Sequence, residues 1–134
     1  MCGLSSIQWP YANLTGANLI SANLSNTNLI SANLISANLT GANLTGTYLA
    51  RANLTGANLH RANLQSAYLT IGANLTGADL TGADLTFASL ANANLTGADL
   101  TGAYLGSNTW SFTTCPDGTN SSTYSPQTCV GHGM

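Results

Sequence analysis

The chain has 134 residues, a formal net charge of −2 and only 4% charged residues, against about a quarter in an ordinary soluble domain. It contains no Lys, so it lacks the clustered positive charge that binds a phosphate backbone, and nucleic acid is excluded as a partner. No run approaches the about 20 apolar residues of a membrane span, and the first residues do not resemble a signal peptide.

A five-residue repeat dominates the chain. Leucine recurs every fifth residue from Leu14 to Leu69 and, after one inserted residue, from Leu75 to Leu105. The residue two before each leucine is Ala, except for Thr27 and Thr47, and the residue between is usually Asn. The unit is therefore A-[ND]-L-[TSI]-[GS], and a repeat of this kind determines the fold.

The same register extends beyond the leucine run. Counting back by five gives Trp9 and then Leu4, with Cys2 in a small-residue slot, and counting forward gives Trp110. Repeats therefore occupy residues 2–112. The two tryptophans lie near the ends, where each ring either covers an open end or simply marks terminal repeat decay.

A period of five fits neither a straight strand nor an α-helix, since both would scatter the leucines over several faces. One arrangement buries the pattern: Ala and Leu, two apart, point inward, and the next residues turn a corner. Glycine suits that corner because it tolerates a positive φ. The chain then coils around its own leucines, and successive coils pair as in a β-sheet.

Spacings of 20 residues indicate four units per coil. Three pairs of equivalent residues have this spacing: Thr27 and Thr47, Tyr48 and Tyr68, and Asp79 and Asp99. The unit resembles that of the pentapeptide-repeat family. The resemblance implies an all-β fold, a right-handed quadrilateral parallel β-helix (solenoid), here with about 5.5 coils of four pentapeptides.

The inserted residue lies at a corner of the predicted coil. Thr70-Ile71-Gly72 stands where Thr-Gly is expected, so we expect Ile71 to bulge outward without shifting the inward residues on either side.

Residues 113–134 have a different composition and form a predicted tail. Cys115-Pro-Asp-Gly is a turn signal, and a bridge from Cys115 to Cys129 would close a small loop and stabilise it by about 3 kcal/mol. Such a disulfide favours a periplasmic, lumenal or secreted location; without it, the cytoplasm is expected. We expect Cys2 to be a core residue.

No constellation for catalysis or metal binding is present in the sequence. We expect His60 to be a solvated side chain beside Arg61, and His132 to lie in a mobile glycine-rich terminus. The three aspartates in the Asn slot, Asp79, Asp84 and Asp99, are expected to form hydrogen bonds at the turns. The sequence therefore predicts no enzyme, no catalytic residue, no cofactor and no metal.

The leading functional prediction is a structural or protein-interaction module of unknown partner. Its candidate contacts are the outward residues Ile20, Ile30, Ile35 and Phe87, and the three isoleucines are expected to cluster in the first two coils. Tyr48 and Tyr68 would form an aromatic ladder on one face, with Tyr104 on another. Open coil ends also suggest an end-to-end homodimer.

Two alternatives remain. The family resemblance implies a gyrase-interacting DNA mimic, but four Asp residues and no Glu cannot imitate a duplex carrying one charge per about 1.7 Å. The other is an ice-binding or water-ordering face. Its ladder would contain Asn13, Asn33, Asn53, Asn74 and Asn94 beside Thr15, Ile35, Thr55, Thr76 and Thr96.

Overall fold

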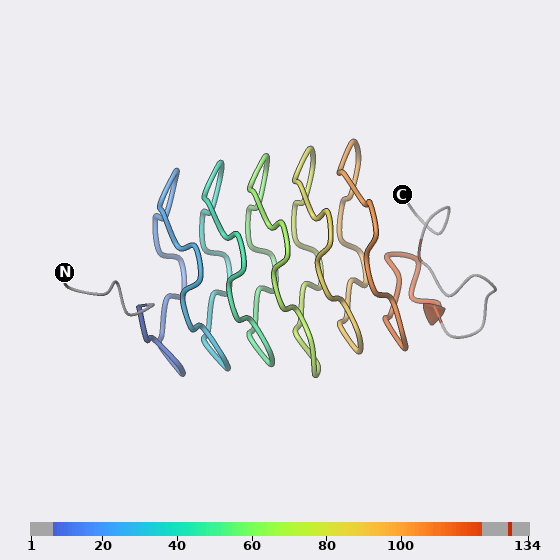
Figure 1. Ribbon diagram of the computed structural model, residues 1–134, viewed down its shortest axis with the longest axis horizontal. Coiled ribbons are helices and arrows are strands. Elements are labelled where there is room, and N and C mark those ends of the chain that lie inside the picture. Colours follow the sequence, from blue (N-terminus) through green and yellow to red (C-terminus); the bar gives the residue numbers. More distant parts are fainter. Residues whose placement is uncertain (1–6, 122–128, 130–134) are drawn as a thin grey trace.

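The repeats wind into coils that stack along one axis, from the N-terminal end in blue to the C-terminal end in red (Figure 1). The computed structural model describes residues 7–121 and residue 129. Parallel bridges join each central residue to its equivalent 20 residues further on, as in Asn28 with Tyr48 and Tyr48 with Tyr68. Each coil therefore contains four pentapeptides, as the 20-residue spacings predicted.

The coil has four faces, which we number in chain order by their central residues. Face 1 contains Gln8, Asn28, Tyr48, Tyr68, Ser89 and Thr109; face 2 contains Asn13, Asn33, Asn53, Asn74, Asn94 and Thr114; face 3 contains Asn18, Asn38, Asn58, Asp79 and Asp99; face 4 contains Asn23, Asn43, Asn63, Asp84 and Tyr104. Within the described part of the chain, each pairing is an isolated bridge, because the chain turns a corner directly after every pair.

Every backbone N–H of a typical unit has an acceptor, as the unit 33–37 shows. The N–H groups of the central residue and of the leucine donate to the two neighbouring coils. The two residues after the leucine are the first and second corner residues: the first donates its N–H to the central Asn side chain, and the second donates to the next coil. The N–H of the following Ala closes the turn. The bonds are Asn33 to Ala12 O (2.8 Å), Leu34 to Asn53 O (2.7 Å), Ile35 to Asn33 Oδ1 (3.2 Å), Ser36 to Thr55 O (3.0 Å) and Ala37 to Leu34 O (3.0 Å). Stacking thus satisfies groups that a single coil would leave unpaired.

The inward leucines and alanines form one continuous core. From Leu29 to Leu95 each repeat leucine is completely buried, and the alanines of the same coils are buried with them. Each leucine contributes about 1.5–3 kcal/mol from burial. Thr47, in an Ala slot, is also buried, and its hydroxyl donates to the Leu24 carbonyl at 2.7 Å.

The second corner position has a left-handed backbone. Ten glycines have positive φ, as expected, but so do thirteen other residues, including Arg51 (φ 59°) and Phe87 (φ 62°). The inserted Ile71 has φ 53° and is 58% exposed. Leu69 and Ala73 on either side remain buried, and only bridges that span the insertion, such as Asn53 with Asn74, are offset by 21 residues.

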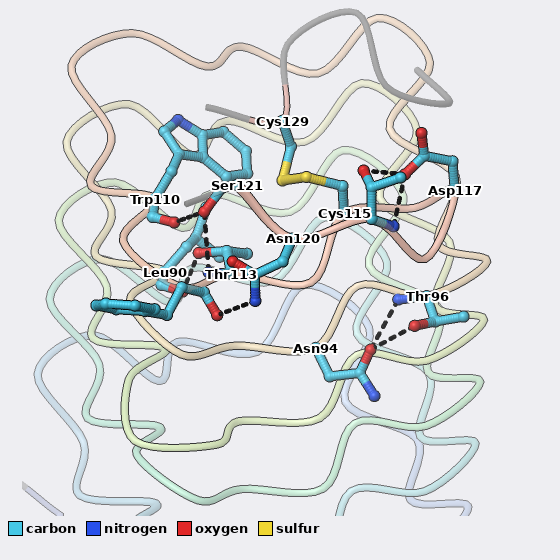
Figure 2. Close-up of a disulfide and its surroundings, with 12 residues drawn as sticks. Leu90, Asn94, Thr96, Trp110, Thr113, Cys115, Asp117, Asn120, Ser121 and Cys129 are labelled. Atoms are coloured by element: carbon cyan, nitrogen blue, oxygen red, sulfur yellow. Dashed lines mark hydrogen bonds between the residues drawn. A yellow bond between two sulfur atoms is a disulfide. The ribbon is translucent and has the colours of Figure 1, made fainter. Parts of the chain in front are cut away.

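The two ends of the stack differ. Trp110 is 5% exposed, whereas Trp9 is 42% exposed. Cys115 and Cys129 form a disulfide beside Trp110, and the Ser121 hydroxyl donates to the Trp110 carbonyl (Figure 2). The described segment around Cys115 and Ser121 therefore covers Trp110 at this end, while Ala103 and Leu105 are only partly buried. Cys2, Leu4 and His132 lie outside the described residues.

Candidate interaction surface

Asn and Asp in the central slot have one chemical role on faces 2, 3 and 4. The side-chain oxygen of the central residue accepts a hydrogen bond from the N–H two residues later. Asn53 Oδ1, for example, accepts from the Thr55 N–H at 3.1 Å and from the Thr55 hydroxyl at 2.6 Å. This local bond holds the first corner residue in place and fixes the outward threonine hydroxyl.

The aspartates take the same role, as predicted. Asp79, Asp84 and Asp99 each accept at 2.9 Å from the N–H two residues later. Burial alone would raise the pKa of Asp84, but hydrogen bonds from Thr86 and Gln65 hold it below its usual value. Hydrogen bonds from the Thr101 hydroxyl and N–H lower the pKa of Asp99. The lowered pKa values of Asp84 and Asp99 favour the ionised form of these two carboxylates.

The histidine considered in the sequence, His60, lies half-buried at the corner that follows face 3, and its backbone N–H donates to Asn58 Oδ1 at 2.9 Å. Among residues 7–121 and 129, no three His, Cys, Asp or Glu side chains are grouped so that they could hold a metal ion.

Face 1 departs from this scheme. Its central residues from the third coil onward are Tyr48, Tyr68, Ser89 and Thr109, and none of them accepts the corner N–H. The N–H groups of Ala50, Thr70 and Ala91 consequently have no acceptor within the described part of the protein. On the same face Asn28 Oδ1 still accepts from the Ile30 N–H at 3.1 Å. The sequence signal of this missing bond is the loss of Asn from the central slot at 20-residue intervals.

Exposed apolar side chains concentrate on this same face. Tyr48 and Tyr68 stack, with ring centroids 5.0 Å apart, which confirms the predicted ladder. Ten large apolar residues are exposed in the described ranges. Six of them lie on face 1 or its two bounding corners: Tyr11, Tyr48, Tyr68, Ile71, Phe87 and Phe112. These six side chains make face 1 the candidate interaction surface.

Charge is also distributed unevenly. Arg51 lies at the corner of face 1, and no ion pair is found for it among the residues that the structure describes. Asp79 and Asp99 lie on face 3 and Asp84 on face 4, with Arg61 at the corner between them. Faces 1 and 2 have no acidic central residue.

The three isoleucines proposed as contacts do not form one patch, which corrects the expectation from the sequence. Ile20, Ile30 and Ile35 follow central residues of faces 3, 1 and 2, so each lies at a different corner. Ile20 is 51% exposed, while Ile30 and Ile35 are half-buried. Proximity in sequence misled the prediction because each pentapeptide turns the chain onto a new face.

A buried leucine column wound by four pentapeptides per coil defines a repeat solenoid. The chain belongs to the pentapeptide-repeat family: the model of pentapeptide repeats (eight copies) matches residues 12–49, 32–70 and 71–106. Proteins of this family form right-handed quadrilateral β-helices. Within the described residues, no helix is long and apolar enough to cross a membrane.

Three solved pentapeptide repeat proteins are similar to the chain. HetL from the cyanobacterium Nostoc sp. strain PCC 7120, involved in heterocyst differentiation regulation, is 36% identical over 87% of this chain, with a TM-score of 0.53. The match spans only 63% of HetL. Rfr23 from the cyanobacterium Cyanothece 51142 is 32% identical over 78% of this chain and 80% of its own, with a TM-score of 0.46. A protein from the Arabidopsis thaliana thylakoid lumen is 31% identical over 75% and 70%, with a TM-score of 0.39. No curated protein matches the chain.

Proposed function

We propose that this protein is a non-catalytic interaction module that binds a protein partner through face 1. The observation that supports this function is that six of the ten exposed large apolar side chains of the described residues lie on face 1 or its two bounding corners. A rigid stack displays such a surface without the entropic cost of ordering it on binding. Repeat solenoids in general bind through extended faces of this kind.

Affinity capture with matched variants tests this function. The double variant Tyr48→Asn/Tyr68→Asn restores the consensus residue of the slot, so it preserves the fold while removing the aromatic ladder. Tyr104→Asn makes the same change on face 4 and is the control. A partner from the source organism should be captured by the wild type and by Tyr104→Asn and lost with the double variant. Equal capture by all three proteins would overturn the proposal.

The disulfide supports an oxidising location for this module, namely the periplasm, a lumen or the extracellular space. Cys115 and Cys129 are both completely buried in the covering of the C-terminal end. Structural disulfides persist in such compartments and are rare in the cytoplasm. Alkylation of free thiols in freshly lysed cells, followed by mass spectrometry, should find this pair oxidised; a reduced pair would place the protein in the cytoplasm.

A second interaction is supported at the N-terminal end of the stack. Ile7 and Trp9, which lie in inward slots, are 45% and 42% exposed, and Leu14 is only partly buried. Covering this end by a second copy would give an end-to-end homodimer. Sedimentation equilibrium should show a dimer that Trp9→Ser dissociates, whereas a monomer at all concentrations would exclude it.

The two alternatives make different use of the polar faces. Face 2 favours water ordering, since its threonine hydroxyls are held by Asn oxygens at 2.6–2.7 Å, in Thr15, Thr55, Thr76 and Thr96. Ile35 interrupts that ladder, and an absence of thermal hysteresis would exclude an ice-binding function.

The gyrase-binding alternative needs a dense negative surface, but the central residues of the faces include only three aspartates. A supercoiling assay without any effect of the protein would exclude it.

A further inference from the structure

Face 1 presents a column of main-chain hydrogen-bond donors. The N–H groups of Ala50, Thr70 and Ala91 occupy equivalent positions in successive coils, because Tyr48, Tyr68 and Ser89 pair by parallel bridges. The spacing along the column is therefore the inter-strand distance of about 4.8 Å. Where Asn or Asp is the central residue on the other faces, it accepts the equivalent N–H, as Asn74 does from Thr76. The Gly106 N–H, which follows Tyr104 on face 4, also has no acceptor among the described residues. On face 1, from Tyr48 onward, no central side chain supplies that oxygen.

These donors lie on residues near the surface. Ala50, Thr70 and Ala91 are half-buried, so the column lies at the surface and not in the core. At Tyr48 and Tyr68 the phenol ring cannot place an acceptor on the N–H two residues later, since its oxygen lies at the far end of the ring. The Ser89 hydroxyl instead accepts from the Thr109 hydroxyl at 2.9 Å. An acceptor oxygen supplied from outside would therefore complete the bonding pattern that Asn or Asp completes elsewhere.

The positive charge beside the column indicates which kind of acceptor group a ligand would supply. Arg51 directly follows the first of these donors, is exposed, and has no ion-pair partner in residues 7–121 and 129. The acidic central residues, Asp79, Asp84 and Asp99, lie on faces 3 and 4. A carboxylate fits here, because it accepts several hydrogen bonds at once and pairs with a guanidinium group in a bidentate arrangement.

Apolar side chains flank the donors on both sides. Tyr48 and Tyr68 are 44% and 46% exposed, and Ile71 and Phe87, at the two corners of the face, are 58% and 65% exposed. A ligand that lies along the donor column therefore also contacts aromatic and aliphatic surface. Aromatic anchors beside charge-assisted hydrogen bonds are typical of protein interfaces.

We propose that face 1 binds an acidic protein segment in which carboxylates alternate with apolar side chains. The carboxylate oxygens accept from the N–H groups of Ala50, Thr70 and Ala91, with Arg51 as their counter-charge. The apolar side chains pack on Tyr48, Tyr68, Ile71 and Phe87. This inference rests on the proposed function, for which it names the chemistry of the partner.

A peptide pair tests the proposal by NMR titration of the full chain. The probe is a terminally blocked octapeptide, Gly-Glu-Leu-Gly-Glu-Leu-Gly-Glu, and its control has Gln in place of each Glu. With the Glu peptide, the amide proton signals of Ala50, Thr70 and Ala91 should move downfield, and the affinity should exceed that for the Gln peptide by about tenfold. The signals of Thr55 and Thr76, whose N–H groups already have acceptors, should not move.

Matched variants separate the contribution of the Arg51 charge to peptide binding from that of the N–H donors. Arg51→Ser should weaken Glu-peptide binding by about tenfold, and serine is already accepted at the equivalent corner position of Ser31. Arg61→Ser, at the face 3 corner, should change nothing. Tyr48→Asn supplies an acceptor to the Ala50 N–H and should abolish the shift of that amide.

The outcomes distinguish the acidic partner from the proposal that face 1 is the interaction surface. Equal binding of the Glu and Gln peptides at face 1, or binding unaffected by Arg51→Ser, would overturn the acidic partner and leave face 1 as the interaction surface. Shifts confined to faces 3 and 4 would overturn both. No shifts with the Glu peptide, but face 1 signals that change with protein concentration, would show that a second copy of the chain covers this face and would also overturn the acidic partner. No change under any condition would exclude the site.

Discussion

Tyr48 and Tyr68, 20 residues apart in the chain, stack with their ring centroids 5.0 Å apart and their planes within 3° of parallel. The stack follows from the parallel bridge between these two residues, which places equivalent side chains of successive coils above one another. The same register that builds the core therefore builds the surface ladder, and any side chain placed at this interval becomes part of a column.

The buried column carries the stability of the fold. Leu59→Ala, in the middle of the stack, removes a completely buried side chain and should lower the free energy of unfolding by about 2–5 kcal/mol in denaturant titrations. Leu14→Ala, where the leucine is only partly buried, should cost about 1 kcal/mol. Equal losses at the two positions would contradict a core that is best packed at its centre.

The local bond from the Asn slot contributes separately. Asn53→Ala removes the acceptor for both the Thr55 N–H and the Thr55 hydroxyl, so we expect a loss of about 1–2 kcal/mol. Asn53→Asp keeps the acceptor and should unfold within about 0.5 kcal/mol of the wild type at neutral pH. If thermal unfolding finds both variants equally destabilised, the hydrogen bonds from Thr55 to Asn53 Oδ1 do not explain the preference for Asn at this position.

The inserted residue stores backbone strain. Ile71 is β-branched and has φ 53°, so Ile71→Gly should raise the free energy of unfolding by about 1 kcal/mol. Ile35 is not among the residues with positive φ, and Ile35→Gly should lower the free energy of unfolding by a similar amount. Chemical denaturation of the two variants checks this, and a loss of stability with Ile71→Gly would show that the isoleucine side chain matters more than its backbone.

Acid should weaken the fold through two carboxylates. The pKa values of Asp84 and Asp99 are lowered in the folded chain from 3.8, so the folded state binds fewer protons than the unfolded state as the pH approaches that value. Stability is therefore fully present above about pH 5 and falls as the pH drops through the folded pKa values. Asp84→Asn/Asp99→Asn retains both acceptors and should flatten this dependence in melting curves between pH 7 and 2. An unchanged slope would assign acid sensitivity to other groups.

Closing the C-terminal end depends on the disulfide. The half-cystines are 14 residues apart, a loop for which cross-linking is worth about 3 kcal/mol. Cys115→Ala/Cys129→Ala should lower the melting temperature and expose Trp110 to fluorescence quenchers. Reduction of the wild-type protein should have the same effect, and a melting temperature insensitive to both changes would remove this role.

Most of the fold could be predicted from the sequence because one energetic term dominates it. Only one winding buries a leucine at every fifth residue, and Thr27, Thr47, Tyr48 and Tyr68 supply the 20-residue period. The asymmetry between Trp9 and Trp110 was not predictable, since it depends on how the segment around Cys115 and Ser121 folds over the end.

Only part of the candidate site could be predicted from the sequence. The tyrosine ladder followed from spacing alone, whereas the free N–H groups beside it became evident only when the acceptor of each corner N–H was identified. Ile20, Ile30 and Ile35 show the limit of the approach: outward direction follows from the register, but the face on which a side chain lies depends on its unit within the coil.

Amide hydrogen exchange of the isolated protein, followed residue by residue, tests most directly whether face 1 differs from the other faces. The account predicts fast exchange at Ala50, Thr70 and Ala91, and slower exchange at Thr55 and Thr76, whose N–H groups donate to Asn oxygens. Equal protection at all five amides would contradict it, because face 1 would then have no donors free to bind a partner.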